Sequence, residues 1–187
     1  MSSITPADRI LKRARKLFYE QGYSTTGIDQ IIAESGTSKK SFYRYYPSKS
    51  DLARAYLKSE REALLGYFEE LTTRQQTYSG FVRAWCKILR TRAHNGTFFG
   101  CPFGNYASQS PDSVRDRKLL VETMEAWRET LEKFLKRCAP SISRAQLTQT
   151  VNRILILYQG GLQMWNITGD ETYLKHLEHE LLLLQPL

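Results

Sequence analysis

The sequence predicts an all-helical protein in which a small N-terminal helical domain precedes a larger one. Apolar side chains recur at helical spacing along nearly the whole chain, and no convincing alternation with a period of two occurs. Residues that favour helix starts come before most of these apolar stripes. The 187 residues, 41% hydrophobic and 25% charged, are typical of a folded globular chain. About nine helices are expected.

The first helix is expected to begin at Thr5-Pro6-Ala7-Asp8, where a capping Thr, an early Pro and an acid three residues after the cap coincide. Gly22 should follow its end. Its apolar stripe consists of Ile10, Ala14, Leu17 and Phe18.

Two short helices should follow. Thr26 can cap the first, which ends at Gly36, and Thr37 or Ser38 can cap the second, which Pro47 ends. Because Gly36-Thr37-Ser38 joins them, the pair over about residues 27–46 has the pattern of a helix-turn-helix.

Ser48, with Asp51 three residues later, should cap a long fourth helix. Further helices are expected at about 77–94, at 101–109, from Ser110-Pro111-Asp112 to Cys138, from Ser143 to Trp165 and from Asp170 onward. We place the domains at residues 1–50 and 51–187, which share this fourth helix.

Charge is concentrated near the N-terminus. The chain carries a net charge of +8, and residues 1–60 hold 11 Lys and Arg against 6 Asp and Glu. An excess of positive charge suggests an anionic partner without deciding between DNA, RNA and a membrane. The N-terminal third is therefore the part to examine for nucleic-acid binding.

The third helix divides into two faces. Phe42 and Tyr46, four residues apart, should point inward. Its outward face should carry Lys39, Lys40, Tyr43 and Arg44. Two lysines, an arginine and a tyrosine suit a DNA major groove, because cations can contact guanine or phosphates and an aromatic edge can contact a thymine methyl.

The same stretch resembles the DNA-binding domain of the TetR (tetracycline-repressor) family of bacterial regulators over about 50 residues. The matching residues are Gly22-Tyr23, Thr26, Ile28 with Ile31, Gly36-Thr37-Ser38, Phe42-Tyr43, Tyr46 and Ser48-Lys49-Ser50-Asp51-Leu52. The departures are Thr37 for Val, Lys40 for Gly, Phe42 for Leu and Tyr46 for Phe. Since Lys40 adds charge at the DNA groove, the preferred DNA sequence cannot be taken from relatives.

The resemblance implies a role for each matching position. Thr26 and Lys49 would bind phosphate at the starts of the second and fourth helices, and Tyr45 would also contact the backbone. The residues that would face base edges are Lys39, Lys40, Ser41, Tyr43 and Arg44. The alternatives are a solvated helix start for the lysines, packing for Tyr43 and capping alone for Thr26.

A helix-turn-helix usually gains specificity as a two-fold dimer, and the family pairs through two C-terminal helices of each subunit. The candidate interface residues are Leu155, Tyr158, Leu162, Trp165, Leu177 and Leu181. The alternative is that this apolar face belongs to the subunit's own core.

The aromatic middle of the chain is, in the family interpretation, a pocket for a small apolar or aromatic effector. Its candidate lining is Trp85, Phe98, Phe99, Phe103, Tyr106, Trp127 and Phe134. Ordinary core packing is the competing interpretation for each of them.

Cys101 precedes Pro102 at an expected helix start, where the helix dipole favours thiolate. A Gly-Cys at this place occurs in some family members, so we consider Cys101 a redox candidate. The alternative is a small buried residue in a tight turn.

No nucleotide-binding loop or nucleophile elbow occurs, so we expect neither an enzyme nor a cofactor, and no metal site. The N-terminus lacks a signal-like apolar stretch, and a cytoplasmic location without membrane contact follows. The expected function is DNA-binding transcriptional regulation by a homodimer, probably the work of a repressor that a small effector, or modification of Cys101, releases from a palindromic operator. The alternative is an architectural protein that holds DNA through charge alone.

Overall fold

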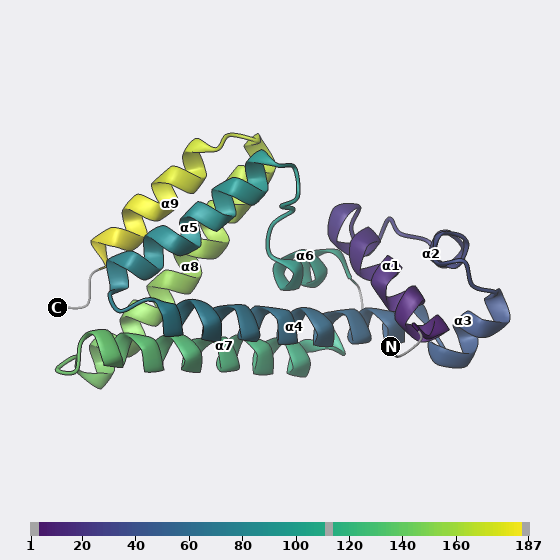
Figure 1. The fold of residues 1–187 in the computed structure, drawn as a ribbon, viewed down its shortest axis with the longest axis horizontal. Coiled ribbons are helices and arrows are strands. Elements are labelled where there is room, and N and C mark those ends of the chain that lie inside the picture. Colours follow the sequence, from purple (N-terminus) through teal and green to yellow (C-terminus); the bar gives the residue numbers. More distant parts are fainter. Residues whose placement is uncertain (1–3, 111–113, 185–187) are drawn as a thin grey trace. The chain divides into compact units, whose positions relative to one another are not determined.

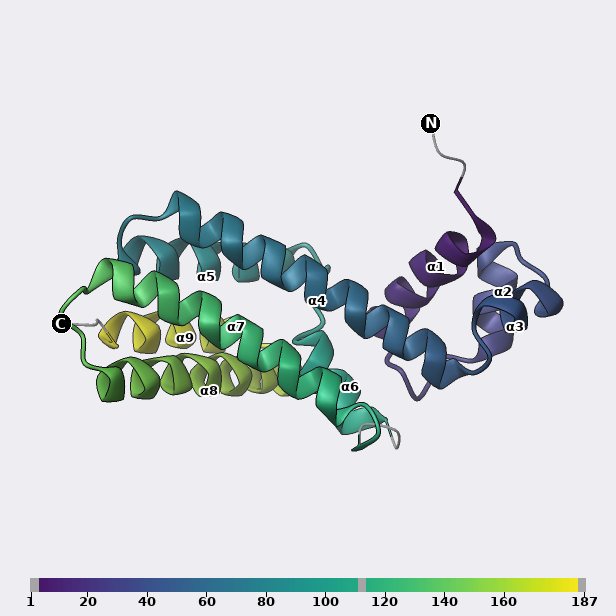
Figure 2. The same cartoon turned by 90° about the horizontal axis from the view of Figure 1, so that it is seen from below.

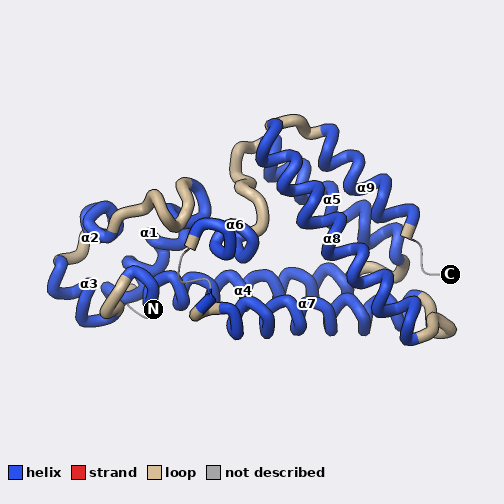
Figure 3. Tube along the Cα trace, turned by 180° about the vertical axis from the view of Figure 1, so that it is seen from behind, coloured by secondary structure: helices blue, strands red, loops and turns tan. Residues whose placement is uncertain are grey.

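The computed structural model describes residues 4–110 and 114–184, and each regular element in these ranges is a helix (Figure 1). The helices are α1 (Pro6–Glu20), α2 (Ile28–Ser35), α3 (Lys39–Tyr45), α4 (Lys49–Arg74), α5 (Tyr78–His94), α6 (Pro102–Gln109), α7 (Arg117–Cys138), α8 (Arg144–Thr168) and α9 (Thr172–Leu183). Figure 3 shows only helices and loops along the described trace. The predicted all-helical class is confirmed.

Local capping explains where the N-terminal helices begin. Thr5 Oγ1 accepts a hydrogen bond from the Asp8 N–H at 3.2 Å, and the Asp8 carboxylate accepts one from the Thr5 N–H at 3.0 Å. Ser38 Oγ accepts from the N–H three residues later, at 3.1 Å. Ser48 Oγ accepts from the Asp51 N–H at 3.1 Å. These starts agree with the sequence prediction.

Thr26 is the exception. The N-cap of α2 is Gly27, with no side-chain cap, and Thr26 Oγ1 donates instead to the Gly22 carbonyl at 2.7 Å. The predicted capping role of Thr26 is therefore wrong. The physical reason is the turn at Gly22, whose φ of +95° brings a free carbonyl within reach of the hydroxyl.

Differences at the later helices are small. α8 extends to Thr168, three residues beyond the predicted end, and the left-handed Gly169 then ends it. Asp170 Oδ1 accepts from the Thr172 N–H at 2.8 Å, at the start of α9. The predicted start of the seventh helix at Pro111-Asp112 lies outside the described residues.

The chain forms two compact units. Unit 1 comprises Met1–Glu62 with Pro102–Val121, and unit 2 comprises Ala63–Cys101 with Glu122–Leu187. α4 and α7 each contribute residues to both units. Grouping by contacts thus adds α6 to the N-terminal helices, an association that the sequence did not suggest.

In unit 1, α1 packs against α2 and α3 (Figure 2). Ile10, Ala14, Ile31 and Phe42 are each 0% exposed at this packing. Their removal from water is the main contribution to holding the three short helices together, since helices this short are marginal alone.

In unit 2, α5 and α8 both pack against α9, as the views of Figures 1 and 2 show. An aromatic cluster fills the interior: Phe68, Phe81, Trp85, Trp127, Phe134 and Tyr158. The Trp85 and Tyr158 rings stack with centroids 5.0 Å apart, and Phe81 and Phe134 are 4.8 Å apart. Each of these six side chains is at most 6% exposed.

Candidate nucleic-acid interface

The outward face of α3 is exposed as the spacing predicted. Lys39, Lys40 and Arg44 are exposed, and Tyr43 is 43% exposed, whereas Phe42 is completely buried. The seven-residue helix therefore presents three cations and an aromatic ring to solvent. This is a suitable surface for base edges and phosphates.

The cations on α3 are only loosely held. Lys39 Nζ lies 3.6 Å from Asp29 Oδ1, and both side chains are largely exposed, so this ion pair is weak and easily exchanged. The Arg44 guanidinium lies over the Tyr45 ring at 5.7 Å. Lys40 has no carboxylate partner among the residues that the structure describes.

Two of the predicted phosphate-binding residues differ in accessibility. Lys49 Nζ lies 4.4 Å from the Tyr23 ring centroid and 3.4 Å from the Ser24 carbonyl oxygen, and partial burial lowers the pKa of Lys49. Thr26 is 1% exposed, with its hydroxyl engaged by the backbone. Ser41 is partly buried and Tyr45 is 39% exposed.

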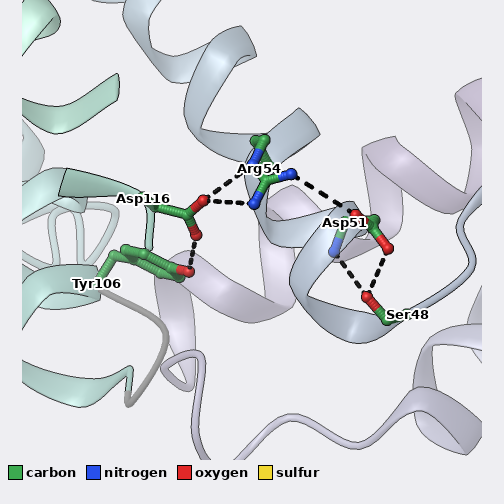
Figure 4. Close-up of polar contacts among 5 residues, drawn as sticks. All are labelled: Ser48, Asp51, Arg54, Tyr106 and Asp116. Atoms are coloured by element: carbon green, nitrogen blue, oxygen red, sulfur yellow. Dashed lines mark hydrogen bonds and ion pairs between the residues drawn. The ribbon is translucent and has the colours of Figure 1, made fainter. Parts of the chain in front are cut away.

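A polar network joins the start of α4 to α6 and the segment that follows α6 (Figure 4). Its centre is Asp116, whose side chain is 1% exposed. The Asp116 carboxylate accepts from the Tyr106 hydroxyl at 2.6 Å and from Arg54 Nε at 2.9 Å. Burial, and then the hydrogen bond to Asp116, raise the pKa of Tyr106. The phenol therefore remains a donor at neutral pH.

The network continues to the cap of α4. The Arg54 guanidinium lies 3.7 Å from Asp51 Oδ1, and Asp51 Oδ2 accepts from Ser48 Oγ at 2.6 Å (Figure 4). Ser48 precedes Lys49, one of the predicted phosphate contacts. The orientation of the first turn of α4 thus depends on a carboxylate 62 residues after Arg54.

α6 also holds the loop that leads into α2. The Tyr23 N–H donates to Gln109 Oε1 at 2.9 Å, and the rings of Tyr23 and Tyr106 meet edge to face at 5.1 Å. A Cβ added to Gly22 would lie 2.5 Å from Gln109 Oε1, so the loop and α6 fit closely only because residue 22 is glycine.

Sequence reasoning missed Arg54, Tyr106, Gln109 and Asp116 as supports of the interface. No local pattern marks them, because each acts through a partner far away in the sequence. A charged residue between short helices is usually a solvated one, and only the fold shows that Asp116 is buried.

The predicted pocket residues are divided between the units. Trp85, Trp127 and Phe134 belong to the unit 2 cluster, and Phe99 is partly buried in the same unit. Phe98 stacks on Trp165 with centroids 5.1 Å apart. The remaining two, Phe103 and Tyr106, lie on α6 in unit 1.

Two buried polar atoms in unit 2 have no hydrogen-bond partner among the described residues: Trp127 Nε1 and the Tyr67 hydroxyl. Trp127 is 0% exposed. Burial raises the pKa of Tyr67 to about 12, so its hydroxyl stays protonated at neutral pH. Both groups are hydrogen-bond donors in an aromatic environment, and an unpaired buried donor costs about 1–3 kcal/mol.

The three cysteines are free thiols in different settings. Cys101 is 5% exposed, and its Sγ lies 3.3 Å from Gln159 Nε2, which can donate to it. Burial raises the pKa of Cys86 to about 12, and burial also raises that of Cys138. Cys86 and Cys138 are therefore thiols at neutral pH.

Most of the predicted dimer residues are buried within unit 2. Tyr158, Leu162, Leu177 and Leu181 are each at most 6% exposed. Leu155 and Trp165 are partly exposed. The large apolar residues left exposed on these two helices are Ile156, Met164, Ile167 and Leu183.

Two searches of the described residues gave no sites of other kinds. No three His, Cys, Asp or Glu side chains gather where they could hold a metal ion. Nor does any described helix combine the length and apolar character needed to cross a bilayer.

The short helices, the glycine turn and the basic outward face define a helix-turn-helix DNA-binding protein. Residues 10–56 match the family model of bacterial regulatory proteins of the tetR family. The chain belongs to this TetR family and is a transcriptional regulator, not an enzyme.

Individual relatives extend the similarity over the whole chain. The regulator LmrA of Bacillus subtilis is 29% identical over 91% of both chains. HbdR of Aromatoleum is 28% identical over 94% of this chain and 77% of its own. A TetR regulator of Legionella pneumophila has the same fold, with a TM-score of 0.83 and 21% identity over 99% of this chain and 100% of its own.

Proposed function

We propose that this regulator is a repressor that binds a palindromic operator as a homodimer and releases it when a small ligand binds. The observation that carries the proposal is the pair of surfaces on one chain. A basic, exposed α3 can enter a major groove, and a separate exposed apolar face on α8 can join two copies. Two recognition helices about 34 Å apart would then contact successive major grooves.

The apolar face on α8 supports dimerisation. Ile156, Met164 and Ile167 recur with helical spacing and are 70%, 39% and 68% exposed. Gly160 lies between them on the same face, where a Cβ would meet nothing within 4 Å. Gly161, in contrast, would place a Cβ 3.1 Å from Leu177 of α9, so it serves packing inside the subunit. The outward stripe is free for a second copy.

Ile156→Glu is expected to convert the dimer to a monomer at micromolar concentration. A charge at the centre of an apolar interface has no partner there, and burying it unpaired is unfavourable. Light scattering after gel filtration measures the mass. Because Ile156 is exposed in the subunit, helix content should not change; Arg153→Glu, an exposed neighbour, is a control for the added charge. A dimer that survives Ile156→Glu contradicts this interface.

The ligand response is supported by the unpaired donors in unit 2. Trp127 Nε1 and the Tyr67 hydroxyl would both gain from a flat, largely apolar ligand that carries a hydrogen-bond acceptor. By preferring a conformation in which these donors are paired, such a ligand would shift the population away from the state that binds DNA.

Tyr67→Phe tests whether that hydroxyl is unsatisfied in the ligand-free protein. Removing an unpaired buried hydroxyl should raise the free energy of unfolding by on the order of 1 kcal/mol, as measured by urea denaturation. Tyr78→Phe is the matched control, because the Tyr78 hydroxyl donates to the Leu181 carbonyl at 2.8 Å and its loss should destabilise. A destabilised Tyr67→Phe would mean that the hydroxyl has a partner.

Modification of Cys101 is the second way in which DNA could be released. The amide of Gln159 favours a thiolate at Sγ, whereas the 5% exposure of Cys101 restricts access by oxidants. We therefore place ligand binding first. Oxidant-sensitive DNA binding that persists in Cys101→Ser would exclude the cysteine.

The experiment that tests the proposed function is selection of bound duplexes from a random DNA library, followed by sequencing, at near-physiological salt. A two-fold symmetric consensus supports the specific dimeric regulator. Enrichment of no sequence by folded, dimeric protein favours an architectural protein that binds through charge alone. Repression rather than activation would follow if the operator overlaps a promoter and transcription rises when the protein is removed.

A further inference from the structure

A second basic surface lies on α1, away from the residues predicted to contact DNA. It is a groove of about 390 Å³ lined by Arg9, Lys12, Arg13, Lys16, Glu34 and Ser35. The four cations recur at i, i+3, i+4 and i+7, so they share one face of α1. We call these six residues the α1 groove.

The charge in the α1 groove is not neutralised from within. Arg13 lies 3.2 Å from the Glu34 carboxylate. Arg9, Lys12 and Lys16 have no carboxylate partner among the described residues. Like charges at this spacing on a helix repel one another and cost a few tenths of a kcal/mol per pair.

Most acids near the groove are already engaged elsewhere. Asp8 accepts hydrogen bonds at the start of α1, Asp29 lies beside Lys39, and Glu60 accepts from Arg15 Nε at 2.9 Å. The excess of three positive charges in the α1 groove can therefore be balanced only by an anion from outside or by solvent ions.

The spacing of these cations suits a line of phosphates. At 1.5 Å per residue, Arg9 and Lys16 are about 10 Å apart along the axis of α1. Phosphates of one DNA strand advance about 3.4 Å per step, so about three steps cover this length. Arginine forks and lysine ammonium groups are the usual protein partners of phosphate oxygens.

The groove is also close enough to the recognition helix to reach the same duplex. Ser35 lines the groove, and only four residues separate it in sequence from Lys39 at the start of α3. Even a fully extended chain would span at most about 14 Å over four residues, and the major groove is about 12 Å wide. A strand bordering the major groove occupied by α3 is thus within this range.

We propose that the α1 groove binds the phosphate backbone of DNA that flanks the bases contacted by α3. The contact adds affinity that depends on salt and not on base sequence, and it lengthens the duplex needed for full affinity. This inference rests on DNA binding by α3 but predicts a different signature from it, because the α1 groove contacts no base.

The test is the salt dependence of DNA binding by the triple variant Arg9→Gln, Lys12→Gln, Lys16→Gln. Each lost phosphate contact lowers the slope of log affinity against log salt by about 0.9, so a drop of about 2–3 is expected on a duplex with long flanks. The ratio of affinities for selected and random sequences of equal length should not change.

A matched variant controls for net charge. Arg83→Gln, Lys87→Gln, Lys133→Gln removes the same three charges from exposed positions in unit 2 and should leave the slope nearly unchanged. A conservative variant, Lys12→Arg with Lys16→Arg, should retain the parent slope. Thermal melting checks that every variant is folded.

Two further arms separate DNA backbone from other sources of phosphate. Trimming the duplex to the selected consensus should abolish the difference between parent and triple variant. Inorganic phosphate, compared with chloride at equal ionic strength, should not compete selectively with the parent protein. An unchanged slope in the triple variant, an equal fall in both triple variants, or selective competition by inorganic phosphate would each overturn the proposal.

Discussion

Replacing Asp116 by alanine is expected to lower the free energy of unfolding by about 3 kcal/mol. The change removes the acceptor of both the Tyr106 hydroxyl and the Arg54 guanidinium, leaving a charge without its buried partner. We take the lower end of the usual range because the Arg54 side chain is 30% exposed and can partly regain water. Urea denaturation followed by circular dichroism measures the loss.

A double variant controls this prediction. Arg54→Met together with Asp116→Leu removes both charges and should recover most of the stability, because no buried charge is left unpaired. A double variant as unstable as the sum of the two single changes would mean that the pair is not what Asp116 contributes. Tyr106→Phe should cost only about 1 kcal/mol, the usual value of one hydrogen bond.

The double variant Lys40→Ala, Arg44→Ala is expected to reduce affinity for the selected DNA sequence by about 100-fold or more. A side chain that contacts a base is worth about 1–3 kcal/mol, so two such losses reach this factor. Fluorescence anisotropy with a labelled duplex measures it. Both side chains are exposed, so stability should not change.

The comparison with random DNA decides what these two cations do. If they contact bases, affinity for random DNA should fall much less than affinity for the selected sequence. The control Lys87→Ala, Lys133→Ala removes two exposed charges from unit 2. Equal losses on both duplexes would mean that Lys40 and Arg44 bind phosphates alone.

The sequence predicted the helices well because their starts are fixed locally. Thr5, Ser38 and Ser48 each accept a hydrogen bond from an N–H three residues later, which a pattern of neighbouring residues can reveal. Thr26 belongs to the same chemical class, but its hydroxyl found the Gly22 carbonyl first. The outcome depended on a loop conformation that no residue pattern specified.

The interface shows the same division. Helical spacing predicted that Lys40 and Arg44 would be exposed and Phe42 buried, since seven residues of one helix determine these faces. The support from Asp116 could not be predicted, because its partner Arg54 is 62 residues away. Helical spacing likewise identified an apolar α8 without showing that Tyr158 is buried within the subunit and Ile156 is exposed.

The contacts of α6 bear on protein engineering. A chimera that joins residues 1–50 of this chain to another regulator would carry Gly22, Tyr23 and the cap of α4 but would leave Gln109 and Asp116 behind. Any other side chain at position 109 or 116 would then have to fit a loop shaped around Gln109 and an arginine that needs a carboxylate. Exchange of DNA specificity between relatives should therefore transfer residues 102–121 together with the N-terminal helices, as one discontinuous cassette.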